Sequence, residues 1–175
     1  MIQVISKNEW VSLNKIIAPE KGCNGYYYLH EERCSGKIVS ILPFRRINNS
    51  NKLEFLLRHE ITPCWNINTP TISSITGGVD KGHTINQTVL IELEEEAGYK
   101  VKESELIPIG ECFGTKSSDT IYYIFSVDLT GKVQNKTLGD GSELEAKAHC
   151  EWHTSIMKAE DPLVYTAYMW LLGEK

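Results

Sequence analysis

Three carboxylates near the middle of the chain have a spacing that suits cation binding. Glu92, Glu95 and Glu96 stand at positions i, i+3 and i+4 of a segment whose pattern predicts a helix. At about 100° per residue these side chains share one face of the helix, where their like charges repel one another. Mg²⁺ prefers carboxylate oxygens as ligands. The simplest chemical interpretation is a magnesium site, although runs of glutamate on helices usually form solvated surfaces.

The helix that must position these carboxylates is predicted over 84–97. Apolar side chains recur every four residues along it and are typical of a helix that packs on a core: Ile85, Val89, Leu93 and Ala97. Thr84 or Asn86 would cap its start, and Gly98 stands where a left-handed glycine commonly ends a helix. Two of the three carboxylates lie beside the apolar stripe, so we expect them near the core.

The segment 77–99 resembles the signature of the Nudix hydrolases, G-x5-E-x7-R-E-U-x-E-E-x-G-U, in which U is bulky and apolar. The matching residues are Gly77, Glu92, Leu93, Glu95, Glu96, Gly98 and Tyr99. His83 replaces the first glutamate of the signature, and Ile91 replaces its arginine. In the family these two residues brace each other and orient the metal-binding face, whereas the later glutamates hold the metal. The resemblance therefore indicates a replaced brace beside a retained metal site.

The resemblance implies hydrolysis of a pyrophosphate bond with Mg²⁺ or Mn²⁺ as the cofactor. Such cations neutralise phosphate oxygens, orient the substrate and lower the pKa of a bound water. Glu92 and Glu96 are expected as direct metal ligands, and Glu95 completes the set and is also expected to be catalytic. Because ligated carboxylates are poor bases, a general base is expected in a loop after the helix. Glu143 is the first candidate and Glu145 the second, with a solvated loop acid as the alternative for each.

The implied substrate is a nucleoside diphosphate linked to another group, such as ADP-ribose or a nucleotide sugar. Arg58 interrupts an apolar strand pattern and is expected to pair with phosphates. Gly77 and Gly78, in the turn before the helix, are assigned to the same substrate-binding site. Trp65 is assigned to it as a ring that stacks on a base, and core packing is the alternative for this side chain.

Two rival functions remain open. The replacements at 83 and 91 favour a catalytically weak or inactive protein that only binds a nucleotide. A Nudix enzyme for a dinucleoside polyphosphate or a modified nucleoside triphosphate would be favoured by a basic patch, which the sequence does not show.

Length and composition predict one globular domain over 1–175, with 1–35 as an N-terminal extension of helix or strand. Hydrophobic residues make up 41% and charged residues 23%, which is typical of globular proteins. The net charge of −5 argues against broad nucleic-acid binding. No apolar run approaches the roughly 20 residues of a membrane span. We therefore expect neither a nucleic acid nor a membrane as a partner.

The cysteines and the N-terminal extension carry two further expectations. The five cysteines are widely spaced and form no C-x-x-C pair, which favours reduced thiols in the cytoplasm over a zinc site. Many ADP-ribose-type relatives are homodimers that exchange N-terminal elements, and the extension is long enough for such an exchange.

The remaining pattern predicts strands around the central helix. Strands are expected over 37–44, 53–61, 71–76, 105–110, 120–129 and 144–152. A turn is expected at 48–51, an irregular loop between Pro63 and Pro70, and a closing amphipathic helix over 161–172. A mixed sheet with a helix on either side is the α/β/α sandwich of the Nudix fold, which the resemblance implies.

Overall fold

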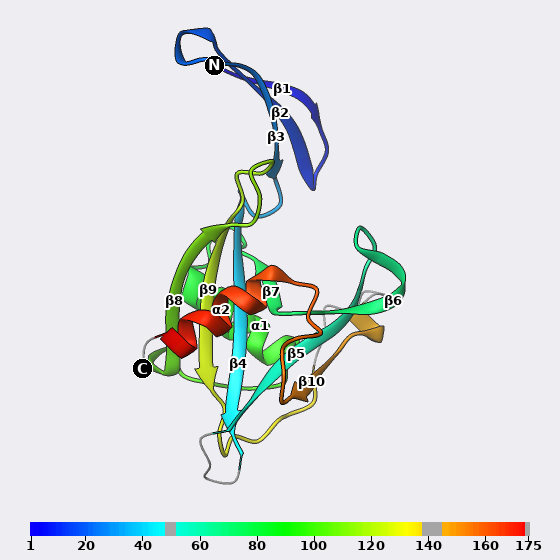
Figure 1. The fold of residues 1–175 in the computed structure, drawn as a ribbon, viewed down its shortest axis with the longest axis vertical. Helices are drawn as coiled ribbons and strands as arrows, with labels where there is room; N and C mark the ends of the chain where they lie inside the picture. Colours follow the sequence, from blue (N-terminus) through cyan, green and yellow to red (C-terminus); the bar gives the residue numbers. More distant parts are fainter. Residues whose placement is uncertain (48–51, 138–144, 174–175) are drawn as a thin grey trace.

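The computed structural model describes residues 1–47, 52–137 and 145–173 (Figure 1). A small sheet contains β1 (Ile2–Lys7), β2 (Val11–Ala18) and β3 (Cys23–Glu31). A larger sheet contains β4 (Lys37–Arg46), β5 (Leu53–Thr62), β6 (Asn66–Ser73), β7 (Ile75–Gly78), β8 (Leu106–Phe113), β9 (Ile121–Asp128) and β10 (His149–His153). The helices are α1 (Ile85–Glu95) and α2 (Pro162–Gly173). Short 3-10 turns cover Pro19–Lys21, Glu103–Glu105 and Glu145–Lys147.

The larger sheet is mixed and follows the order β10-β5-β4-β9-β8, with β6 paired to β5 and β7 paired to β4. β4 runs parallel to β9. The other edge of β4 pairs with two strands. Residues Ile38–Ile41 pair antiparallel with β7, and Phe44–Arg46 pair antiparallel with β5. Consequently β5 and β7, two strands that carry predicted site residues, both lie on the same side of β4.

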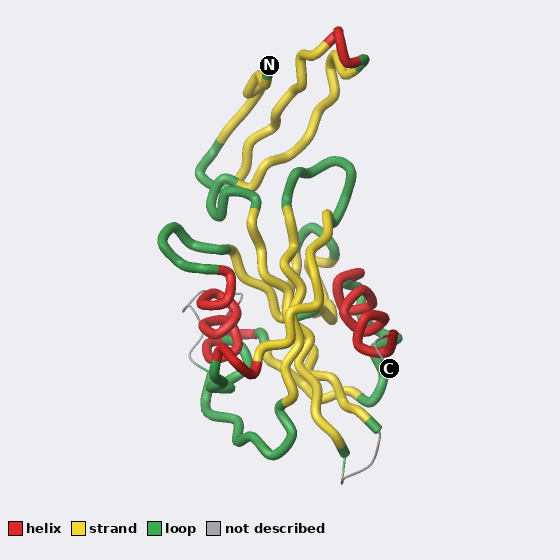
Figure 2. Tube along the Cα trace, turned by 90° about the vertical axis from the view of Figure 1, so that its left-hand side faces the viewer, coloured by secondary structure: helices red, strands yellow, loops and turns green. Residues whose placement is uncertain are grey.

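The two α-helices cover opposite faces of this sheet (Figure 2). Successive side chains of a strand point to opposite faces, and β4 accordingly contributes to two cores. Ile41 packs in the core that includes Val89 and Leu93 of α1. Leu42 packs in the core that includes Val164 of α2. The predicted α/β/α sandwich is confirmed.

The N-terminal extension is a three-stranded antiparallel sheet that projects away from the sandwich (Figure 1). It joins the rest of the chain where Leu29 of β3 bridges to Ser118 in the loop between β8 and β9. The hydroxyl of Tyr26 donates to the carbonyl of Lys116 in the same loop. Every residue of β1 is exposed, so this sheet has one strand with little contact to the main core.

Most predicted elements are confirmed, with three corrections. The strand predicted over 71–76 is divided between the end of β6 and the start of β7, and Gly77 and Gly78, predicted in a turn, belong to β7. The segment between Pro63 and Pro70 is not an irregular loop, because β6 begins at Asn66 and pairs with β5. The predicted strand over 144–152 is shorter and later, since β10 begins only at His149. The predicted turn at 48–51 lies outside the described residues. None of the described helices has the length and apolar character needed to cross a membrane.

Candidate active site

The helix α1 is fixed at both ends by its own sequence. Thr84 caps the start: its hydroxyl accepts from the backbone N–H of Gln87, and the Gln87 side chain accepts from the backbone N–H of Thr84. Gly98 ends the helix region with φ of +74°. A Cβ at Gly98 would lie 2.2 Å from the backbone oxygen of Asn135, so only glycine fits this close approach. The orientation of the carboxylate face is therefore set locally.

Glu92 of α1 lies directly against the backbone of Gly77 in β7. A Cβ at Gly77 would lie 1.8 Å from Oε1 and 2.1 Å from Cδ of Glu92. The carboxylate thus occupies the space that any larger residue at position 77 would fill. This contact joins the glycine at the start of the signature to the first glutamate of the helix.

Glu96, the C-cap residue of α1, is held by an arginine from the sheet. Arg58 of β5 places its Nη2 3.1 Å from Oε1 of Glu96 and its Nε 2.9 Å from Oε2 of Glu60. The side chains of Arg58 and Glu96 are only 4% and 9% exposed. Burial alone would lower the pKa of Arg58, but the charges of Glu96 and Glu60 raise it above its ordinary value. The guanidinium therefore stays charged between two carboxylates.

Cys150 of β10 closes the buried side of this ion-pair group. Its thiol lies 3.5 Å from the backbone oxygen of Glu96, and Cys150 is the direct cross-strand neighbour of Arg58. Burial raises the pKa of the Cys150 thiol to about 12, against an opposing effect of the Arg58 charge. The thiol is therefore protonated at neutral pH and is not a nucleophile there.

The predicted magnesium ligands fit the chemistry of a hard cation. They are carboxylates, one of them seated in a notch left by a glycine and another beside a buried arginine. Glu95 is half-buried on the same helix. Elsewhere in the described residues, the ligand atoms of His59, Glu151 and His153 lie within 4.8 Å of one another.

The structure brings together some of the predicted site residues and separates others. Gly77 contacts Glu92, and Arg58 contacts Glu96, whereas Gly78 approaches Cys34 rather than the carboxylates. Trp65 lies elsewhere, in a cavity of about 390 Å³ lined partly by the start of α2.

The remaining candidates lie on loops and turns. Glu143 lies outside the described residues, and Glu145 begins a 3-10 turn. His83 is exposed in the turn before α1. Its backbone N–H donates to the carbonyl of Asp80.

Two partners in the carboxylate group were not predicted from the sequence. Glu60 stands two residues after Arg58, so strand alternation places both side chains on one face. This spacing is a local signal that was available. Cys150 belongs to a strand nearly a hundred residues away, and only the pairing of β10 with β5 brings it beside Arg58.

Comparison with known proteins assigns the family. Residues 39–162 match the NUDIX domain family, and the chain therefore belongs to the Nudix family. This match confirms the family predicted from 77–99. No curated protein sequence matches the chain.

Solved structures with the same fold include an "ADP compounds hydrolase", with a TM-score of 0.68 and 11% identity over 99% of this chain and 93% of that one. A MutT/nudix family protein from Enterococcus faecalis gives a TM-score of 0.51 and 14% identity over 66% and 42% of the chains. The MERS1–RNA complex of T. brucei gives a TM-score of 0.52 and 18% identity, over 61% of this chain and 38% of that one.

These likenesses are of fold alone. The chain spans less than half the length of the MERS1 and MutT/nudix chains that it matches. The expectation that nucleic acid is not a partner stays a prediction from the net charge.

Proposed function

We propose that the protein hydrolyses the pyrophosphate bond of a nucleoside diphosphate linked to a second group, with Mg²⁺ or Mn²⁺ as the cofactor. ADP-ribose and nucleotide sugars are the substrates that this proposal favours. The likeness over nearly the whole chain to an ADP compounds hydrolase supports this substrate class. The observation that carries the proposal is the support of Glu92 and Glu96 by Gly77 and Arg58.

Arg58 supplies, from β5, the positive charge that the signature would normally place on the helix at position 91. It pairs with Glu96 at 3.1 Å and is itself held by Glu60. The buried, planar guanidinium is held by ion pairs to both Glu60 and Glu96. Because this arrangement is rigid, it fixes the orientation of the Glu96 carboxylate. We therefore assign Arg58 a positioning role; its role in phosphate binding stays a prediction from the sequence.

Glu92 and Glu96, with Glu95, would hold the divalent cation. When bound, this cation would neutralise and orient the pyrophosphate oxygens. The chain itself provides the rigid helix face and the glycine notch at position 77 that admits the Glu92 carboxylate. Glu143 remains the proposed general base, and Gly77, Gly78 and Trp65 remain proposed substrate contacts.

A second copy of the chain is the proposed partner of the N-terminal sheet. The exposed apolar side chains of this sheet and of its first connection are Ile2, Val4, Ile5, Trp10, Val11, Tyr26, Tyr27 and Leu29. Burying such a surface between two copies is favourable. A mass of two chains by light scattering would support the dimer, and a single-chain mass at high concentration would contradict it.

The five free thiols suit the cytoplasm, which we propose as the location.

The activity is tested with purified protein and a panel of nucleoside diphosphate derivatives, with Mg²⁺, with Mn²⁺ and with EDTA. The expected result is metal-dependent release of a nucleoside monophosphate from at least one compound. Binding of a nucleotide without release from any compound, in either metal, would instead support the nucleotide-binding alternative. His83, exposed in place of the first signature glutamate, is the observation that favours this alternative.

A further inference from the structure

A cluster of histidines lies on the opposite face of the sheet from α1. His149, Glu151 and His153 alternate along β10, and His149 pairs directly with His59 of β5. The residues between them face the other way, because Cys150 and Trp152 pack against the core under α1. The cluster is therefore separate from the carboxylates of α1, and the proposed hydrolase does not use it.

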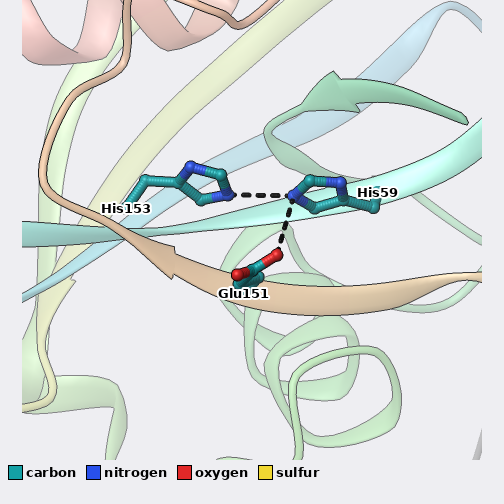
Figure 3. Close-up of side chains that lie close together, drawn as sticks. All are labelled: His59, Glu151 and His153. Atoms are coloured by element: carbon teal, nitrogen blue, oxygen red, sulfur yellow. Dashed lines mark hydrogen bonds and ion pairs between the residues drawn. The ribbon is translucent and has the colours of Figure 1, made fainter.

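The side chains of His59, Glu151 and His153 converge on one point (Figure 3). The Nε2 atoms of His59 and His153 are 2.9 Å apart, and Nε2 of His59 is 3.7 Å from Oε2 of Glu151. All three ligand atoms lie within 4.8 Å of one another. With metal–ligand distances of about 2.0 to 2.2 Å, two ligands of a tetrahedral ion are about 3.3 to 3.5 Å apart. Small side-chain rotations would thus bring the three atoms to ligand spacing.

The surroundings of His59 favour an imidazole that is ready to bind a metal. Its ring is nearly parallel to that of His149, with ring centroids 4.9 Å apart and an interplanar angle of 16°, and to that of His153, at 5.1 Å and 18°. Its side chain is 16% exposed, whereas that of Glu151 is 61% exposed. The site therefore has a fixed inner ligand and an outer ligand that solvent reaches.

We propose that His59, Glu151 and His153 form a binding site for a transition-metal ion of the zinc class. Two imidazoles and one carboxylate suit Zn²⁺, whereas Mg²⁺ and Ca²⁺ prefer oxygen ligands alone. Three protein ligands leave a fourth position for water or a further ligand. This site is distinct in ligand chemistry from the carboxylate face of α1.

The ion would join β10 to β5. In the described part of the sheet, β10 is an edge strand whose strand partner is β5, and the two are linked by backbone pairing from His149 to His153. One ligand from β5 and two from β10 would add a cross-link between these strands. Since an ion that binds only the folded state stabilises it, Zn²⁺ is expected to raise the melting temperature.

The test uses the full chain after removal of metals by a chelator, at pH 7.5. We expect one Zn²⁺ per chain by calorimetric titration. We also expect a rise in Tm of about 5 to 10 °C when free Zn²⁺ is 100 times its Kd. Bound Co²⁺ should show the visible absorption of a tetrahedral site. Failure of the unaltered protein to bind Zn²⁺ at 100 µM free ion, a level about a hundred times a micromolar Kd, would overturn the proposal.

Variants identify the ligands. His153→Gln and Glu151→Gln should each weaken Zn²⁺ binding by at least about 100-fold. Glu151→Gln changes an exposed side chain, so its fold is not in question. His83→Gln is the matched control, because His83 is an exposed histidine in a distant turn. Unchanged Zn²⁺ affinity in both ligand variants would refute the assignment. Glu96→Gln should retain Zn²⁺ binding, so this test is independent of the hydrolase proposal.

Discussion

Replacing Gly77 by alanine should disable the carboxylate face while leaving the fold intact. The new Cβ would lie 1.8 Å from Oε1, 2.1 Å from Cδ and 2.6 Å from Cγ of Glu92. An ordinary contact needs about 3.4 Å, so the Glu92 oxygen must move by about 1.6 Å. A misplacement of about 1 Å in a reacting group costs roughly 100-fold in rate. We therefore expect kcat/KM of Gly77→Ala to fall by about 100-fold.

Stability should change little in this variant. The φ of Gly77 is outside the left-handed region, so alanine fits the backbone. The group that must move is the end of a flexible side chain, and alanine reduces the entropy of the unfolded chain by about 0.4 to 1 kcal/mol. We expect Tm to stay within about 4 °C of the unaltered protein.

The assay compares kcat/KM with Tm for Gly77→Ala and for Ile75→Val on the same strand. Ile75 is fully buried, and its loss of a methyl group should cost about 0.5 to 1.5 kcal/mol without moving Glu92. Ile75→Val should thus lower Tm and keep its activity, whereas Gly77→Ala should keep its Tm and lose activity. Full activity in a correctly folded Gly77→Ala protein would refute the inference that the Glu92 position matters.

Three further predictions concern charge, capping and thiol chemistry. Arg58→Met should lower the free energy of unfolding by about 3 to 5 kcal/mol in urea denaturation, because it removes the guanidinium from the buried Glu96 carboxylate; a loss under about 1 kcal/mol would contradict this. Thr84→Ala should cost about 1 kcal/mol by removing the helix cap, and an unchanged Tm would count against the capping box. At pH 8 iodoacetamide should alkylate the exposed Cys23 and spare Cys150, whose pKa is raised to about 12 by burial; rapid labelling of Cys150 in the native protein, read by mass spectrometry, would disprove this.

The helix and its carboxylates were predictable because their signals are local. The cap at Thr84, the apolar spacing and the turn at Gly98 act within a few residues. The strand over 66–73 was missed because Pro63 and Pro70 read as breakers. Proline is tolerated here because β6 pairs only with β5 in the described sheet, and the register shifts between Glu60 and Thr62.

The partners of the carboxylates could not be predicted from local pattern. Arg58 is visible as a charge in an apolar strand, yet the same pattern fits a phosphate ligand and a buried ion pair. Only the placement of β5 beside α1 shows that its guanidinium meets Glu96. Likewise, the histidines of β10 form a cluster only because β10 pairs with β5, which places His59 beside residues about ninety positions later.

Glu96, at the C-cap of α1, is proposed to serve a metal-dependent hydrolysis, and two matched variants test this role. Release of a nucleoside monophosphate from the best substrate is measured with Mg²⁺ for Glu96→Gln and Glu94→Gln. Glu94 is the matched control, because it pairs with exposed Lys100 at 2.8 Å on the outside of the helix. We expect at least about a 100-fold loss of kcat/KM in Glu96→Gln and less than about a twofold change in Glu94→Gln. Equal activity of the two folded variants would contradict it.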